Sequence, residues 1–112
     1  NVKIETTLCN EDPYKNSNVI SNLDGSRVII PTPGEKGYML GSATIEIIDV
    51  QADQENDSLV LLITHGKTSF LFTGDIGTKI ESKILSSGPD VSCDVLKVAH
   101  HGSKYSSVLY NL

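Results

Sequence analysis

The sequence predicts an α+β fold, in which a mixed β-sheet carries one packed helix. Apolar and β-branched runs of strand length alternate with turn-forming residues, which is typical of strands. A helical periodicity appears once, over residues 77–87, and a further strand-like run follows it. The chain has 112 residues, 38% hydrophobic and 21% charged, so we expect one modest core in a single domain or a piece of one.

The first forty residues predict little regular structure. Residues 1–27 are rich in Asn, Ser, Asp and Lys, which supports at most one short strand or an irregular helix. Val28 to Ile30 is a β-branched run, but the prolines and glycines of PTPGEKG follow it, so we expect a loop there. We therefore interpret 1–40 as an irregular lead-in and 41–107 as the core of a single partial domain over 1–112.

The core begins with a strand and a hairpin. Ala43 to Val50, ATIEIIDV, is a β-branched run of strand length between turn formers. Two further apolar runs, Leu59 to Thr64 and Ser69 to Thr73, flank a short polar turn that contains Gly66. This arrangement predicts a β-hairpin.

After Asp75 the periodicity changes to that of a helix. Apolar side chains recur at helical spacing at Ile76, Ile80, Ile84 and Leu85. The charged residues between them are expected to face elsewhere: Lys79, Glu81 and Lys83. Gly88-Pro89 ends the helix, and CDVLKVA, residues 93–99, predicts the last strand. If this strand lies parallel to Ser69 to Thr73, across a right-handed crossover, both strand ends open at one edge of the sheet.

Composition limits the classes of function. The formal net charge is −5 and no Lys/Arg-rich run occurs, so the usual footprint of phosphate-backbone binding is missing. A polyanionic substrate would have to be held locally, for example by metal ions. Cys9 and Cys93 form no CxxC pair, which disfavours a sulfur-only metal site and leaves a disulfide or two buried thiols. No apolar run approaches the roughly 20 residues of a membrane span.

Residues able to do chemistry stand at the predicted strand ends. FLFTGD places the Asp75 carboxylate where the backbone leaves the sheet, and VLKVAHHGS ends in His100 and His101. A carboxylate and an imidazole that converge suit a divalent ion such as Zn²⁺, Mn²⁺ or Fe²⁺. Because a catalytic zinc generally has three protein ligands, the sequence predicts part of a metal site.

Purely structural readings compete with this one. Asp75 at a strand-to-helix junction suits a helix N-cap, and the two histidines suit a solvated turn. On an extended backbone adjacent side chains point in opposite directions, so only one histidine is expected to reach the metal edge. His65 is expected to be a turn residue, about 17 Å or more from Asp75.

Three segments of the sequence, in their order and spacing, resemble the later motifs of the metallo-β-lactamase superfamily. They are NDSLVLLI, FLFTGD and DVLKVAHHGS. More narrowly, they resemble the hydrolase domain at the C-terminal end of ComEC-type DNA-uptake proteins. The resemblance covers roughly Ala43 to Ser107 and implies part of an αββα sandwich. The superfamily's HxHxDH motif, which supplies most ligands of both metals, is absent from the sequence. The chain alone is therefore expected to be inactive.

The resemblance also implies roles for individual residues. Asp75 matches the aspartate that bridges two metal ions, and one of His100 and His101 matches the last histidine ligand. His100 is favoured because it directly continues the predicted strand. Residues expected to support the ligands or contact substrate are Asn56, Asp57, Ser58 and Ser103.

The function implied is a metal-dependent phosphodiesterase or nuclease, with two divalent ions, Zn²⁺ or Mn²⁺, in the complete domain. Its partners would be DNA or a small phosphodiester, and the remainder of the parent domain. One alternative is a secreted esterase of the same superfamily that acts on small phosphodiesters, which the missing basic patch favours. The other is a structural or interaction module without catalysis. Exposed strand edges further predict self-association of the fragment.

Overall fold

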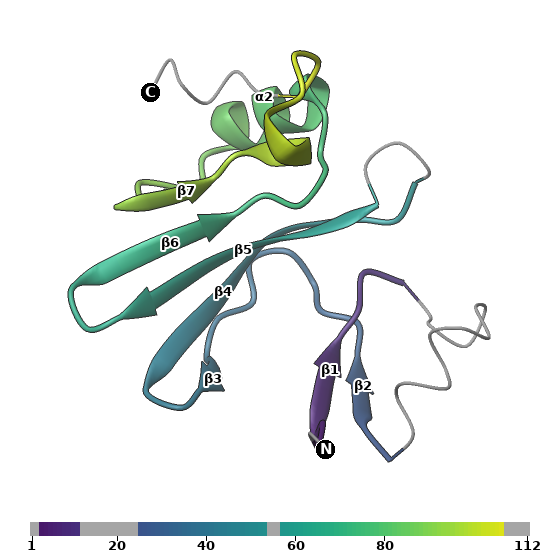
Figure 1. The fold of residues 1–112 in the computed structure, drawn as a ribbon, viewed down its shortest axis with the longest axis vertical. Coiled ribbons are helices and arrows are strands. Elements are labelled where there is room, and N and C mark those ends of the chain that lie inside the picture. The colour runs from purple at the N-terminus through teal and green to yellow at the C-terminus, as the bar shows by residue number, and fades with distance from the viewer. Residues whose placement is uncertain (1–2, 12–24, 54–56, 107–112) are drawn as a thin grey trace.

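The computed structural model describes residues 3–11, 25–53 and 57–106 and confirms the α+β class. Its centre is a five-stranded sheet in the order β3-β4-β5-β6-β7, and a separate two-stranded sheet pairs β1 with β2 (Figure 1). The main strands are β3 Tyr38–Leu40, β4 Ala43–Gln51, β5 Ser58–His65, β6 Thr68–Phe72 and β7 Val95–Lys97. Neighbours from β3 to β6 are antiparallel, whereas β6 and β7 are parallel, so the sheet is mixed.

The predicted strand and hairpin are confirmed. β4 begins at the expected Ala43 and ends one residue beyond Val50. β5 and β6 pair antiparallel up to His65 and Thr68, which leaves a turn of two residues. Gly66 adopts φ +60° in this turn, a left-handed conformation that glycine reaches without steric cost.

The predicted helix is confirmed as α2, Thr78–Ser87, and Gly88 follows it with φ +98°. The helix connects the parallel strands β6 and β7 and packs on the sheet. The buried core joins strand, helix and loop residues: Ile48, Val60, Leu71, Ile76, Ile80, Ile84, Val91 and Ala99. Fully burying one such aliphatic side chain stabilises the fold by about 1.5–3 kcal/mol.

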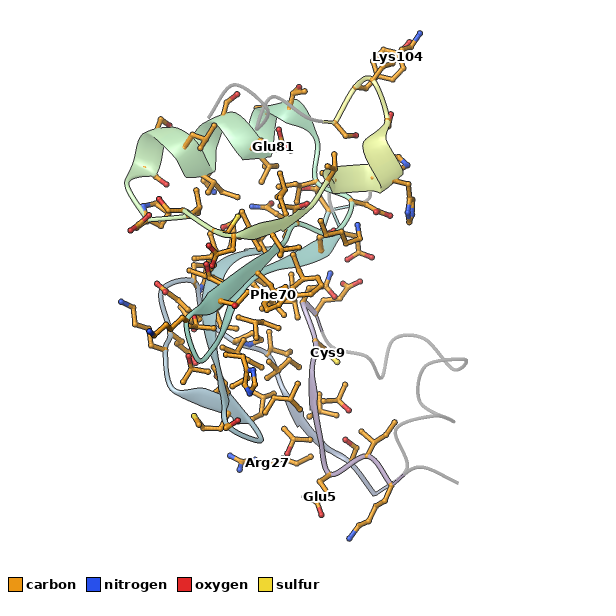
Figure 2. The ribbon with its side chains drawn as sticks, turned by 60° about the vertical axis from the view of Figure 1, so that its left-hand side comes forward. Glu5, Cys9, Arg27, Phe70, Glu81 and Lys104 are labelled. Carbon is orange, nitrogen blue, oxygen red and sulfur yellow. The ribbon has the colours of Figure 1, made fainter. Side chains whose placement is uncertain are left out.

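The expectation that Glu81 faces away from the core is wrong. Glu81 is 1% exposed, and Figure 2 shows it on the side of α2 that faces the sheet. It stands three residues before Ile84 and directly after Ile80, so it shares the buried face of the helix with both.

The lead-in contains more structure than the sequence predicts. Residues 1–27 were expected to form at most one short strand or an irregular helix. β1, Thr6–Leu8, is a short strand, and it pairs in parallel with β2, Arg27–Ile29. The prediction of a loop after β2 is wrong at Tyr38–Leu40, because these residues form β3, which pairs antiparallel with the start of β4. Leu40 pairs with Ala43 across a two-residue turn in which Gly41 has φ +60°.

The last strand is shorter than predicted. β7 covers Val95–Lys97, and the histidines do not continue it. They lie in a 3₁₀ turn, η2, Ala99–Gly102, where His100 and His101 have φ values of 48° and 56°. Ala99 is fully buried and the His100 amide donates to the Gly74 carbonyl at 3.0 Å, so the chain turns across the end of β6.

Both cysteines are free thiols and half-buried, which excludes a Cys9–Cys93 disulfide in this structure. Burial raises the pKa of the Cys9 thiol above its ordinary value. Within the described residues, every helix is too short or too polar to cross a membrane.

Candidate functional site

Hydrogen bonds tie the ends of β6 and β7 together. The Thr73 hydroxyl, on a residue that is 1% exposed, donates to the Lys97 carbonyl at 2.6 Å. The Lys97 ammonium donates to the Gly74 carbonyl at 3.3 Å, which the His100 amide also contacts. The two strands are parallel, so the segments that follow them leave the sheet at the same edge, as expected.

Asp75 stands at this edge on a tightly held backbone. Its amide donates to the Ser58 hydroxyl at 2.8 Å, which fastens the loop after β6 to the start of β5. The preceding Gly74 has φ +58°, and a Cβ there would lie 2.5 Å from the Ser58 Oγ atom. The helix N-cap is Gly77, without a side-chain capping bond, so the N-cap reading of Asp75 is wrong.

The structure brings His101 closest to Asp75. The distance from His101 Nε2 to Asp75 Oδ1 is 3.8 Å, and the two side chains are 79% and 53% exposed. The rings of His100 and His101 are 6.3 Å apart at their centroids and inclined by 72°. The backbone of both histidines is left-handed and not extended as predicted, but the two side chains still line different depressions.

Asp75 lies between two surface depressions. The first, which we call the strand-side depression, has a volume of about 400 Å³ and is lined chiefly by Asn10, Asp57, Ser58, Asp75, Lys97 and His101. The second, the helix-side depression, has a volume of about 310 Å³ and is lined chiefly by Asp75, Thr78, Lys79, His100, Tyr105 and Ser106. The Asp75 carboxylate is therefore accessible from both.

The other sequence candidates occupy different positions. Ser58 holds the Asp75 amide, and Asp57 lines the same depression, where its carboxylate accepts a hydrogen bond from Asn10. The Ser103 amide donates to the His100 carbonyl at 3.0 Å, so Ser103 closes the histidine turn. Asn56 lies outside the described residues.

His65 is separate from this group, as expected. It is the last residue of β5 and pairs with Thr68, so it lies just before the turn and not in it as predicted. The other end of β5 begins at Ser58 beside Asp75. Its Nε2 atom lies 3.0 Å from the Ser42 hydroxyl. His65 therefore offers an exposed imidazole remote from the candidate site.

The Asp75 and His101 donors fit two neighbouring ligands of one ion. Two ligands of a tetrahedral zinc, each about 2.1 Å from it, lie about 3.4 Å apart. The measured 3.8 Å separation differs by a few tenths of an ångström, which exposed side chains can close by rotation. Among residues 3–11, 25–53 and 57–106, no three His, Cys, Asp or Glu side chains could together hold an ion. These residues therefore supply part of a ligand set.

Sequence reasoning missed Asn10 and Lys97. Asn10 donates to the Gln51 carbonyl at 2.8 Å as well as to Asp57, and so links the lead-in to the site. No local pattern marks it, because its partners lie more than forty residues away. Lys97 did have a signal, since it is the one charged residue inside the apolar run VLKVA.

Comparisons with known proteins give one partial match. The chain is 43% identical over 56 residues to ComE operon protein 3 of Bacillus subtilis strain 168. The matched stretch makes up 50% of this chain and 7% of that protein. No protein-family profile and no solved structure matches the sequence. The chain is thus similar to a fragment of ComE operon protein 3 and spans a small share of its length.

Proposed function

We propose that this chain supplies part of a metal-dependent phosphodiesterase, in which Asp75 and His101 hold a divalent ion. The observation that carries the proposal is the 3.8 Å separation of Asp75 Oδ1 and His101 Nε2 at the edge where β6 and β7 end in parallel. The motif resemblance to the hydrolase domain of ComEC-type DNA-uptake proteins supports this activity, and the partial similarity to ComE operon protein 3 is consistent with it. Zn²⁺ or Mn²⁺ suits this pair of oxygen and nitrogen donors.

Each residue of the edge has a part in this proposal. A divalent ion would activate water and stabilise the charge that develops on a phosphate group. Asp75 would offer its carboxylate to one ion, or to two in the complete domain, while Ser58 fixes its backbone. His101 would offer Nε2. Lys97 would brace the site, because its ammonium contacts the carbonyls of Gly74 and Val98 at 3.3 and 3.4 Å.

Two substrate classes follow from different observations. The resemblance of the motifs to those of ComEC-type DNA-uptake proteins favours DNA. The net charge of −5 favours a small phosphodiester, since surfaces that bind DNA are usually basic. In either case the phosphodiester linkage is the group acted on, and the remaining ligands belong to the rest of the parent domain.

Metal retention and hydrolysis test the proposal together. The chain and a version extended at both ends would be loaded with Zn²⁺ or Mn²⁺, dialysed, and measured by elemental analysis and by hydrolysis of bis(p-nitrophenyl) phosphate. We expect the extended version to retain metal and hydrolyse the diester, and Asp75→Asn to lower hydrolysis by more than about 100-fold. Asp90→Asn removes the same charge from an exposed loop, and it should change neither metal retention nor hydrolysis.

Two results would refute the proposal. One is retention of less than a fraction of an equivalent of metal by both versions, which would instead favour a structural or interaction module. The other is full hydrolysis by the Asp75→Asn variant, since a metal ligand cannot be lost without effect.

A further inference from the structure

We propose that the helix-side depression binds a second phosphate group of the substrate, next to the one that reacts at Asp75 and His101. The substrate class is then a chain of phosphodiesters, such as an oligonucleotide, rather than a single diester. The identity of the substrate rests on the proposed function, whereas anion binding in the depression can be measured without it.

The N-terminus of α2 provides the first group of donors. The amides of Thr78 and Lys79 come too early in the helix to have an intrahelical acceptor, whereas those of Ile80 and Glu81 both donate to the Gly77 carbonyl at 3.1 Å. The N-cap residue is Gly77, which has no side chain that could accept a hydrogen bond from these two amides. The aligned peptide dipoles of the ten-residue helix make its N-terminus favourable for an anion.

Ser106 is an independent indication of a ligand. It is 3% exposed and lines the helix-side depression, yet its hydroxyl makes no hydrogen bond with the described residues. Every fully buried side-chain oxygen in the described part of the chain has a partner. The Ser106 hydroxyl must therefore keep an opening, and the depression that it lines supplies one. A hydroxyl at such a site costs free energy unless a ligand or water pairs with it.

Charge and position are consistent with a phosphate. Lys79 is exposed at the rim of the depression, and the His100 imidazole and Tyr105 phenol offer further donors. The Asp75 carboxylate opposes an anion, so binding in the metal-free chain should be weak. Because Asp75 lines both depressions, a phosphodiester chain that crosses it would place one phosphate beside His101 and the next beside the helix.

The anion site is tested on the metal-free chain with inorganic phosphate, at an ionic strength held constant with sodium chloride. Backbone amide resonances of Thr78 and Lys79 should shift and saturate, with a dissociation constant on the order of millimolar. Ser106→Ala and Thr78→Pro should each weaken binding about tenfold. Proline is tolerated at the first helical position, so Thr78→Pro removes the amide donor while keeping the helix.

Two lysine variants that each remove one positive charge from the helix complete this test. Lys79→Gln should weaken phosphate binding about threefold, whereas Lys83→Gln, one helical turn further on, should weaken it less than about twofold. Absence of a saturable shift would overturn the inference, and so would equal effects of the two lysine variants. Loss of binding in Thr78→Pro but not in Ser106→Ala would reduce the site to a bare helix end and would also overturn it.

The second-phosphate role is tested in the extended version of the chain. Ser106→Ala should raise KM for a thymidine oligonucleotide about tenfold and leave KM for bis(p-nitrophenyl) phosphate unchanged, because that diester has one phosphate. Equal effects on both substrates would contradict the inference. If the wild type hydrolyses neither, the proposed function fails, while the phosphate titration still decides whether the anion site exists.

Discussion

Gly74→Ala tests whether the close approach of β5 to the loop after β6 positions Asp75. A Cβ at position 74 would lie 2.5 Å from Oγ and 2.7 Å from Cβ of Ser58. The Cβ atom of Ser58 is fixed to its backbone, so rotation of the serine side chain cannot relieve the clash. The start of β5 or the loop must move, and the bond from the Asp75 amide to Ser58 must loosen.

The loss in the free energy of unfolding can be divided into backbone strain, overpacking and the loss of one hydrogen bond. A left-handed alanine costs about 1–2 kcal/mol at either Gly74 or Gly66, whose φ values are +58° and +60°. Nothing lies within 4 Å of a Cβ at Gly66, so Gly66→Ala carries this strain alone. Gly74→Ala adds about 1–3 kcal/mol of overpacking and the loss of one hydrogen bond, about 1 kcal/mol. We therefore expect Gly74→Ala to lower the free energy of unfolding by about 2–4 kcal/mol more than Gly66→Ala.

Urea unfolding followed by circular dichroism measures both variants, and equal slopes against denaturant would show that the same surface is exposed. A difference between them below about 0.5 kcal/mol, which is the usual range for a neutral surface change, would refute the reasoning. It would mean that Ser58 does not constrain the backbone at Asp75.

Two further predictions concern other parts of the chain. A hydrogen bond from the Tyr38 hydroxyl, and then one from the Thr32 amide, hold the pKa of Glu35 below its ordinary value of 4.5. Tyr38→Phe should raise this pKa in an NMR titration. Because the pKa of Glu35 is lower in the folded state, its carboxylate contributes stability above pH 4.5, and this stability is lost as the pH falls through the folded-state pKa. An unchanged pKa would exclude the Tyr38 bond as its cause. Self-association is expected through the exposed edges of the main sheet, where Leu40 on β3 is 66% and Val95 on β7 is 47% exposed; light scattering should show dimers that Val95→Lys weakens, and a clean monomer at all concentrations would contradict this.

Local sequence patterns were sufficient to predict the central strand, the hairpin and the helix. The β-branched run from Ala43, the hairpin around Gly66 and the helical repeat that ends at Gly88 are signals carried by neighbouring residues, and the structure follows them closely. The parallel pairing of β6 with β7 was a condition of the sequence prediction, and the structure meets it. Once this condition is met, the common edge of Asp75 and the histidines follows from the sequence.

The arrangement within that edge depends on contacts that local patterns do not encode. The left-handed turn at His100 and His101 is held by the Gly74 carbonyl, twenty-six residues from the His100 amide. Without that contact the run VLKVAHH is best read as a continuing strand, which led to His100 as the favoured ligand. β3 was missed because its three residues stand between turn-forming segments and gain their structure from pairing with β4.

The most direct test of the central claim is the response of the imidazole nitrogens to Zn²⁺. In a long-range proton–nitrogen NMR spectrum of the chain, we expect Zn²⁺ to shift the His101 Nε2 resonance strongly and to leave the resonances of His65, remote from Asp75, unchanged. Asp75→Asn should weaken the His101 response, because the carboxylate and the imidazole would hold the same ion. No shift at His101, or the same shift at His101 and His65 with or without Asp75, would contradict a metal site at this edge.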